Sequence, residues 1–437
     1  MQERKSKALI WLRNDLRLAD HFAFHHAAQH TEGAVAYYTF DPKHYIETSW
    51  GFKKTGSFRA QFVIETLHQL KHDLAQKNIS LIVDTQAPEI GISQWTQKLS
   101  ITDVYYQDEW TREEKISSES VRKELTSAIT IHTFYDQFLF HPEDIPMEIE
   151  NLPEVFTTFR KICEKMGRVR PCFSEISAFP KGNLIPQEFK IPTVSDLGLS
   201  QVERHPHSAF PFKGGSRSGK QRMDHYFWET EKLSFYKQTR NGLLGIDYSS
   251  KLSAWLSNGS LSARQIYWEV MAYENEVKKN QSTYWMIFEL IWRDYFKYIS
   301  LKHGDRIFHL GGILKKTYHW NNHPSKLASW INGTTQEPFV NANMIELLKT
   351  GWMSNRGRQN VASFFAKNLL MDWRMGAHYF ESQLIDYDVH SNYGNWMYVA
   401  GVGNDPRNRK FNVRMQAERY DEGGKFQRLW NQQTLFE

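Results

Sequence analysis

Short apolar runs alternate with segments of helical periodicity in the N-terminal part of the chain, and this alternation most constrains the fold. The apolar runs cover residues 8–12, 34–40, 80–83, 103–106 and 130–134. Amphipathic stretches lie between them, for example residues 22–30 and 59–77. Buried strands that alternate with helices are typical of a parallel sheet with helices on both faces. We therefore predict a Rossmann-like α/β domain, although no Gly-x-Gly-x-x-Gly dinucleotide fingerprint follows the first run.

The alternation ends near residue 136, and a different pattern replaces it. Residues 137–211 are irregular and contain several prolines, with one short helical run over 157–165. Such a segment typically crosses the protein surface as a connector. Helical periodicity then continues to the end of the chain. We therefore predict an α/β domain over 1–136, an interdomain connector over 137–211 and an all-α domain over 212–437.

Composition excludes several classes of protein. The 54 basic and 49 acidic residues give a net charge of +5, which permits nucleic-acid binding without demonstrating it. Cys163 and Cys172 are the only cysteines, so a four-cysteine zinc or iron–sulfur site is excluded and we expect no metal. No apolar stretch reaches the length of a membrane span, and the N-terminal apolar run is too short for a signal peptide. We expect a cytoplasmic monomer that does not associate with membranes.

Polar residues are concentrated in residues 351–404, on a background of helical apolar periodicity. We expect a helix over 359–370 and a second one that begins after Asp372 and ends at Asp386, followed by a turn-like segment over 388–392. Each charge taken alone is explained by a structural ion pair, and each tryptophan by the core. Together, the arginines, asparagines and aspartates brought to adjoining helix ends require a polar ligand that satisfies them.

Several long motifs resemble the photolyase and cryptochrome flavoprotein family, and most closely its DASH cryptochrome branch. They read TGWMSNRGRQNVASF, DWRMGAHYFESQLIDYDVHSNYGNW and VAGVGNDPR in the C-terminal part, and WLRNDLRLAD near the N-terminus. The resemblance covers nearly the whole chain. It implies that the all-α domain binds FAD.

The serines of SSKLS, residues 249–253, surround the start of a predicted helix, where hydroxyls and free backbone N–H groups can hold a phosphate. A serine-rich helix start is also common without a ligand. The resemblance assigns this motif to the FAD pyrophosphate, with Lys251 in place of the family's usual arginine. The FAD-binding residues that we predict from the resemblance are Tyr236, Ser249, Ser250, Lys251, Leu252, Ser253, Arg293, Asn355, Arg358, Asp386, Asp388 and Asn392.

The resemblance also implies residues that line the lesion cavity, face the flavin or transfer electrons. Glu289 and Trp292 would line a lesion cavity, although Glu289 and Arg293 also fit a simple helix ion pair. Asn392 would face flavin N5, where an amide suits a reduced flavin. Trp396, Trp373 and Trp320 would carry electrons between flavin and surface, and each alone is equally explained as core.

DNA is the partner that the resemblance implies, with Arg240, Glu289, Trp292, Asn355, Gln359 and Tyr398 as contacts. Tyr398 stands where duplex-acting relatives have a second tryptophan beside the lesion, and Gln359 stands where they have methionine. A smaller stacking platform recovers less of the energy of base extrusion, so we expect single-stranded DNA to be preferred, with duplex loops or RNA as further options. Repair of (6-4) lesions is not expected, because Ser354–Arg356 supplies no histidine.

Basic residues around this region are candidate phosphate contacts, although charge runs are usually solvated faces. They are Arg217, Lys220, Arg222, Arg240, Arg407 and Arg409. The loop Gly214–Ser216 reads GGS where DASH proteins commonly read GGE, which puts contacts of that loop in doubt.

An antenna pigment, methenyltetrahydrofolate, is implied for the α/β domain. Glu113 is our candidate for its carboxylate partner and Glu114 is the rival, while an acidic helix start explains both equally well. The predicted function is light-driven repair of cyclobutane pyrimidine dimers, preferentially in single-stranded DNA, by electron transfer from excited reduced FAD. The alternative is a blue-light photoreceptor without repair activity. Only residues 408–437 follow the last motif, which leaves little room for an output tail and favours the enzyme.

Overall fold

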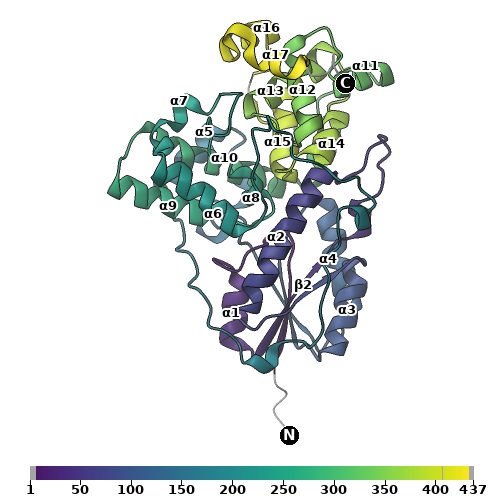
Figure 1. Ribbon diagram of the computed structural model, residues 1–437, viewed down its shortest axis with the longest axis vertical. Coiled ribbons are helices and arrows are strands. Elements are labelled where there is room, and N and C mark those ends of the chain that lie inside the picture. Colours follow the sequence, from purple (N-terminus) through teal and green to yellow (C-terminus); the bar gives the residue numbers. More distant parts are fainter. Residues whose placement is uncertain (1–5, 406, 433–437) are drawn as a thin grey trace.

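The computed structural model describes residues 6–405 and 407–432 and contains an α/β half and a helical half (Figure 1). The α/β half consists of β1 (Lys7–Trp11), α1 (Phe22–His30), β2 (Gly33–Thr39), α2 (Ser57–Ala75), β3 (Leu81–Asp84), α3 (Pro88–Lys98), β4 (Asp103–Gln107), α4 (Arg112–Glu124) and β5 (Thr130–Phe134). The strands form one parallel sheet in the order β3-β2-β1-β4-β5. The predicted α/β class is confirmed.

Successive side chains of each strand enter two different apolar layers. On β1, Ala8 and Ile10 pack in the layer that contains α1 and α2, whereas Leu9 and Trp11 pack in the layer that contains α3 and α4. A strand buried on both faces needs apolar residues throughout, which explains the continuous run ALIW. The carboxyl ends of the strands point toward the helical half (Figure 1).

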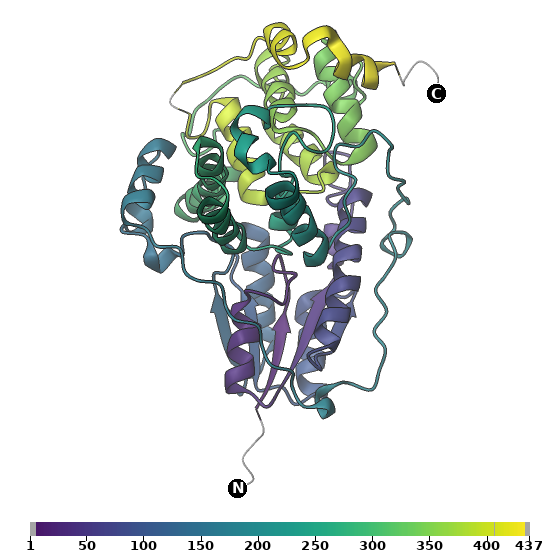
Figure 2. The same ribbon diagram turned by 60° about the vertical axis from the view of Figure 1, so that its left-hand side comes forward.

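The connector leaves the sheet after β5, forms α5 (Phe156–Met166), and runs along the side of the α/β half before it returns (Figure 2). Asn183 fastens it there. Its side chain donates to the carbonyl oxygens of Ala34 (2.8 Å) and Asn78 (2.7 Å) and accepts from the Ala34 amide (3.1 Å). These bonds satisfy backbone groups that the connector would otherwise bury.

The helical half surrounds α10, which contributes twelve buried residues and contacts α5, α7, α9 and α15. Its α-helices are α6 (Ser216–Asp224), α7 (Tyr236–Thr239), α8 (Ser253–Ser257), α9 (Ala263–Glu276), α10 (Gln281–His303), α11 (Pro324–Ile331), α12 (Pro338–Thr350), α13 (Asn355–Ser363), α14 (Trp373–Gln383), α15 (Val389–Ala400), α16 (Val413–Tyr420) and α17 (Lys425–Asn431). Two π-helical turns, His225–Glu229 and Phe364–Asn368, continue α6 and α13.

Three local expectations differ from the structure. The helix predicted over 359–370 begins earlier, because the Ser354 hydroxyl accepts from the Gly357 amide and caps α13. The turn-like segment predicted over 388–392 is wrong: Asp388 caps α15, and the next residues are helical. Helix α3 was not among the predicted elements. The domain limits at 136 and 211 stay predictions. The nearest ends of regular elements are Phe134, where β5 ends, and Ser216, where α6 begins.

Candidate functional site

A loop before the short helix α8 presents serines and a buried lysine. Lys251 has a left-handed backbone (φ 65°), which a residue with a side chain rarely adopts without a functional or packing reason. Its ammonium nitrogen lies 3.0 Å from the ring centroid of Tyr248 and has no hydrogen-bond acceptor among the described residues. Burial lowers the pKa of Lys251 well below its usual value. An unpartnered buried cation fits a site for an anionic ligand.

Arg222 of α6 holds this loop in shape. Its guanidinium donates to the backbone carbonyls of Ser249 and Ser250, both at 3.0 Å, and pairs with Asp247 at 2.7 Å. The side chain is buried. The prediction that Arg222 contacts DNA phosphates is therefore wrong, because its charge is already used inside the protein.

Three elements converge on Asp386, which follows α14. Arg358 of α13 donates to the two Asp386 carboxylate oxygens at 2.9 and 3.0 Å, and the Ser253 hydroxyl donates to one of them at 2.7 Å. Asp386 is 8% exposed. The ion pair between Arg358 and Asp386 anticipated from the sequence is thus present.

Asp388 forms a second charged pair beside the first. It accepts from the Ser391 amide at 2.8 Å and pairs with Lys297 of α10 at 3.1 Å. Burial alone would raise the pKa of Asp388, but the charges of Lys297, His390 and Arg293 hold it far below its usual value. Asn392, one turn further along α15, donates to the Ala377 carbonyl at 3.0 Å.

Lys251, Arg358, Asp386 and Asp388 line one cavity of about 270 Å³. Of the predicted residues, its wall contains Tyr236, Arg240, Ser249, Ser250, Lys251, Leu252, Ser253, Glu289, Arg293, Asn355, Arg358, Asp386 and Asp388. Trp292, Gln359, Asn392 and Tyr398 are outside this wall. Arg293 donates to the carbonyls of Gln137 and Leu256 and so ties α10 to the start of the connector and to the end of α8.

Sequence reasoning missed two aromatic residues of the wall, Tyr248 and Trp352. Tyr248 directly precedes the SSKLS motif, and Trp352 lies inside TGWMSNRGRQNVASF three residues before Asn355, which was the available signal. The Trp352 indole donates to the Tyr248 hydroxyl at 3.2 Å. The two rings therefore form the apolar side of the pocket that holds Lys251.

Glu289 of α10 and Arg240, which follows α7, form an ion pair in the same wall. Burial raises the pKa of Glu289, and Arg240 opposes that change. Nearby, Trp292 stacks on Phe156 of the connector helix with centroids 3.6 Å apart. Tyr398 meets Trp292 edge-on at 6.1 Å, so the two predicted stacking residues are neighbours. The Gln359 side-chain oxygen accepts from Arg356 at 2.8 Å.

The other candidate phosphate contacts differ in their availability. Arg217 pairs with Asp73 at 2.6 Å and Arg409 with Asp405 at 3.2 Å, whereas Lys220 and Arg407 are exposed. The Gly214–Ser216 loop packs on α2, since the Gly214 amide donates to Glu65 at 2.8 Å.

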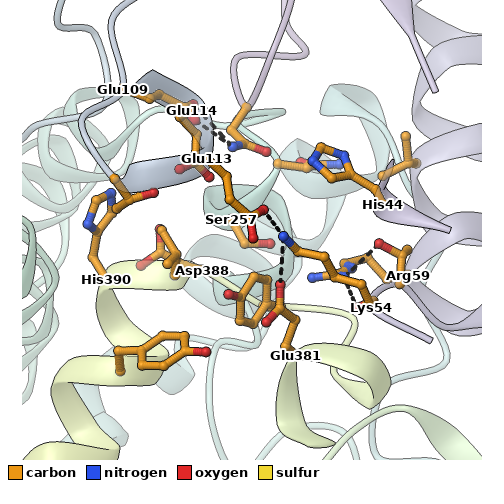
Figure 3. A pocket seen from close by; sticks show the side chains of 18 of the residues that line it. His44, Lys54, Arg59, Glu109, Glu113, Glu114, Ser257, Glu381, Asp388 and His390 are labelled. Atoms are coloured by element: carbon orange, nitrogen blue, oxygen red, sulfur yellow. Dashed lines mark hydrogen bonds and ion pairs between the residues drawn. The ribbon is translucent and has the colours of Figure 1, made fainter. Parts of the chain in front are cut away.

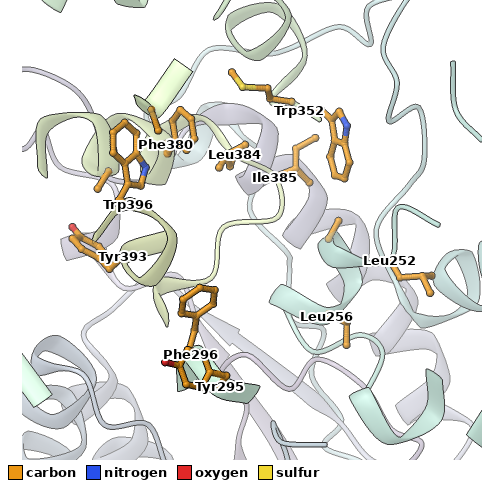
Figure 4. Close-up of a cluster of buried hydrophobic side chains, with 14 of the residues drawn as sticks. Leu252, Leu256, Tyr295, Phe296, Trp352, Phe380, Leu384, Ile385, Tyr393 and Trp396 are labelled. Carbon is orange, nitrogen blue, oxygen red and sulfur yellow. The ribbon is translucent and has the colours of Figure 1, made fainter. Parts of the chain in front are cut away.

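The three predicted relay tryptophans lie in adjoining elements. Trp396 of α15 and Trp373 of α14 are buried, and Trp320 is partly exposed (Trp396 is shown in Figure 4). Trp396 rests on Gly376, one turn after Trp373; a Cβ on Gly376 would lie 2.2 Å from its ring. The backbone of Asn321 pairs with Met371, which brings Trp320 close to the start of α14. Trp396 and Trp373 are both buried, and Trp320 is the most exposed of the three.

A second cavity of about 400 Å³ lies between the two halves, at the carboxyl end of the sheet (Figure 3). Glu114 is half-buried, with one carboxylate oxygen buried and without a hydrogen-bond partner among the described residues, and burial together with Glu109 raises its pKa to about 7. Glu113 has a side chain that is 60% exposed and pairs with Lys54. Arg293 and Asp388 line both cavities, so only one layer of side chains separates them.

Comparison with known proteins agrees with this geometry. Residues 8–180 match the family described as DNA photolyase, and residues 285–434 match the FAD binding domain of DNA photolyase. Cryptochrome DASH of Xenopus laevis is 46% identical over 427 residues, which are 96% of this chain and 81% of the relative. Cryptochrome DASH of Gloeobacter violaceus is 45% identical over 97% of this chain and 85% of its own length. The chain belongs to the cryptochrome DASH branch of the photolyase and cryptochrome family.

A solved member of this family shares the architecture. The crystal structure of a Synechocystis cryptochrome superposes with a TM-score of 0.94 at 43% identity, covering 98% of this chain and 89% of the other. The helical FAD-binding half predicted from the sequence is thereby confirmed. Among the described residues, no group of histidine, cysteine and acidic side chains could hold a metal ion, and no helix could cross a membrane.

The residues of the first cavity fit FAD. Lys251 offers an unpartnered buried ammonium group to a diphosphate, and the serines around it offer hydroxyl donors. Arg358 and Asp386 offer a fixed charge pair to the polar edge of a flavin ring. Tyr248 and Trp352 supply apolar surface for the rest. The individual roles of these residues stay predictions.

Proposed function

We propose that the chain repairs cyclobutane pyrimidine dimers in light and prefers them in single-stranded DNA. The observation that best supports this proposal is that one cavity is lined both by Arg358 and Asp386, which suit the polar edge of a flavin, and by the Glu289–Arg240 pair. A dimer bound at that pair would lie next to FAD. When bound, FAD supplies the light-excited electron donor.

Glu289 and Arg240 have different roles at the substrate. Arg240 keeps Glu289 ionised while the two are paired, because the adjacent cation favours the carboxylate. A DNA phosphate that draws Arg240 away leaves the half-buried Glu289 carboxyl without its cation, and burial raises the pKa of that carboxyl. The protonated Glu289 then donates a hydrogen bond to a pyrimidine carbonyl and stabilises the negative charge that develops there.

Trp292 and Tyr398 support the single-strand preference. Trp292 already stacks on Phe156, so its exposed edge and the Tyr398 ring offer limited surface to extruded bases. Extrusion from a duplex costs about a few kcal/mol more than from a single strand. A limited platform recovers less of this energy, which favours substrates that are already unpaired.

We also propose that the second cavity holds a pterin antenna such as methenyltetrahydrofolate. Glu114 rather than Glu113 is its carboxyl partner: both line the cavity, but Glu114 has a buried carboxylate oxygen without a partner among the described residues, whereas Glu113 is mostly exposed and already pairs with Lys54. Cytoplasmic location and a monomeric state stay predictions.

The test is illumination of the reduced, FAD-loaded protein with thymine-dimer oligonucleotides, single-stranded and in duplex. We expect repair of the single strand to be faster, and Glu289→Gln to lower it while FAD content is retained. Glu276→Gln on the exposed surface of α9 is the matched control. Repair of neither substrate, with FAD present, would contradict the proposal and favour a blue-light photoreceptor.

A further inference from the structure

Tyr393 lies between the tryptophan relay and the second cavity. Its ring meets that of Trp373 nearly edge-on, with centroids 6.1 Å apart and an interplanar angle of 78°. The residue is 3% exposed and also lines the second cavity. Figure 4 shows it on α15, beside Trp396. An oxidisable phenol is thus packed directly against the middle member of the proposed relay.

The Tyr393 hydroxyl has a base within reach. It lies 3.4 Å from Nε2 of His378, and Nδ1 of the same ring lies 3.5 Å from a carboxylate oxygen of Glu381. A carboxylate at Nδ1 favours the tautomer with its proton on that nitrogen, which leaves Nε2 free to accept. Burial alone would raise the pKa of Glu381, but the neighbouring His378 ring and the charge of Lys54 hold it below its usual value.

Electron loss from Tyr393 must be accompanied by proton loss. Burial raises the pKa of the Tyr393 phenol well above its usual value, so the side chain is neutral before oxidation. Tyr379, the neighbour of His378 on α14, provides a contrast. Its hydroxyl is buried without a hydrogen-bond partner among the described residues, so nothing there can take a proton.

We propose that Tyr393 is a second endpoint of the tryptophan relay, with His378 as its proton acceptor. The proposal rests on the relay in the proposed function. One electron passes from Tyr393 to the radical cation of Trp373, which returns to neutral tryptophan. The Tyr393 O–H bond breaks and its proton forms an N–H bond at His378 Nε2. A neutral tyrosyl radical and an imidazolium beside Glu381 result, so charge and atoms balance.

This endpoint differs from Trp320 in where it leaves the radical. Trp320 is partly exposed, and a radical there is open to reductants in solution. A radical on Tyr393 is held in the wall of the second cavity, and its return to Trp373 requires the proton to move back. The relay would therefore branch at Trp373 into a surface route and an internal route.

The experiment uses the FAD-loaded full chain and the variants Trp320→Phe, Tyr393→Phe and the double variant. Flavin absorbance and electron paramagnetic resonance are followed under blue light, with protein containing ring-deuterated tyrosine as the spectroscopic marker. We expect Trp320→Phe to keep photoreduction and to show a radical whose spectrum narrows on tyrosine deuteration. The double variant should lose both, and His378→Asn in the Trp320→Phe background should lose the tyrosyl signal.

Matched variants separate this idea from its competitors. Tyr379→Phe in the Trp320→Phe background should leave the signal unchanged, as should Tyr318→Phe, which removes the tyrosine beside Trp320. A signal that survives Tyr393→Phe, or a loss of photoreduction in Trp320→Phe alone, would overturn the assignment of Tyr393. Absence of photoreduction in the unaltered protein would instead overturn the relay, and this proposal with it.

Discussion

At the scale of single residues, Gly376 decides how closely Trp396 can approach α14. A Cβ at this position would lie 2.2 Å from Cη2 and 2.8 Å from two further ring atoms of the indole. We predict that Gly376→Ala displaces Trp396 and destabilises the protein by about 1–3 kcal/mol through overpacking. Flavin photoreduction should slow as well, which flash absorbance measures.

Gly182→Ala is the matched control, because nothing lies within 4 Å of its added Cβ. If Gly376→Ala left both stability and photoreduction unchanged, the close approach of Trp396 would have no role in the relay.

Glu346 of α12 is a buried acid near Lys251, and it makes stability depend on pH. Burial raises its pKa from 4.5 to about 8, although the charge of Lys251 opposes the shift. A raised folded-state pKa means that the folded chain holds this proton more tightly than the unfolded chain. The stabilisation is therefore complete below pH 4.5 and is lost as the pH rises toward about 8.

We predict that Glu346→Gln, which cannot ionise, flattens this dependence. Between pH 5 and pH 8 the unaltered protein should lose up to about 4 kcal/mol of stability that the variant keeps. Urea unfolding at both pH values measures the difference. Parallel pH profiles would show that Glu346 is ionised in the folded protein throughout.

At the scale of elements, the start of α15 depends on Asp388. The residue caps the helix through the Ser391 amide and at the same time neutralises Lys297, which is buried. Its loss removes the cap, worth about 1 kcal/mol, and leaves a buried cation unpaired, which costs roughly 3–5 kcal/mol.

We predict that Asp388→Ala lowers Tm and FAD content together, and that Asp388→Asn recovers part of the cap but not the charge. Thermal unfolding and flavin absorbance of the purified variants check this. Equal behaviour of the two variants would show that capping contributes nothing measurable.

Helix ends were also where sequence reasoning was weakest. The start of α13 was placed at Gln359 instead of after Ser354, and Asp388 was assigned to a turn, since serine and aspartate favour both turns and helix starts. Partners distant in sequence help to decide whether such a residue lies in a turn or starts a helix, as Lys297 does for Asp388. Strands and apolar helix faces were predictable because their periodicity is local, as for β1 and α1.

At the scale of the whole molecule, the site could be predicted as a set of residues but not as atoms in space. Arg222 read as part of a solvated charge run, yet the structure buries it against loop carbonyls that lie 27 and 28 residues further along the chain. Glu114 was only a rival to Glu113, because adjacent residues of a helix start cannot be assigned to inside or outside without the neighbouring half.

A network of buried charged residues joins the two halves, and no local sequence pattern predicts it. Arg264 of α9 donates to Asp20 at 2.8 Å and to Asp136 at 3.1 Å, both in the α/β half. Arg17 of that half donates in return to the Gly259 carbonyl at 3.1 Å. Burial alone would raise the pKa of Asp20, but the charges of Arg17 and Arg264 hold it below its usual value. Ionised Asp20 therefore stabilises the folded chain above its unfolded pKa of 3.8, and this is lost as the pH falls.

We predict that Arg264→Ala destabilises the protein by roughly 3–5 kcal/mol, because it removes one of the two arginines that balance the buried carboxylates of Asp20 and Asp136 and leaves Arg17 alone beside both. Since those carboxylates belong to the α/β half and the lost arginine to the helical half, the junction is what weakens. Calorimetry should then resolve two transitions where the unaltered protein shows one. The second cavity lies at the same junction, so the variant should also lose affinity for any ligand bound there, while exposed Arg217→Ala should not. A single unshifted transition in Arg264→Ala would mean that apolar packing alone joins the halves.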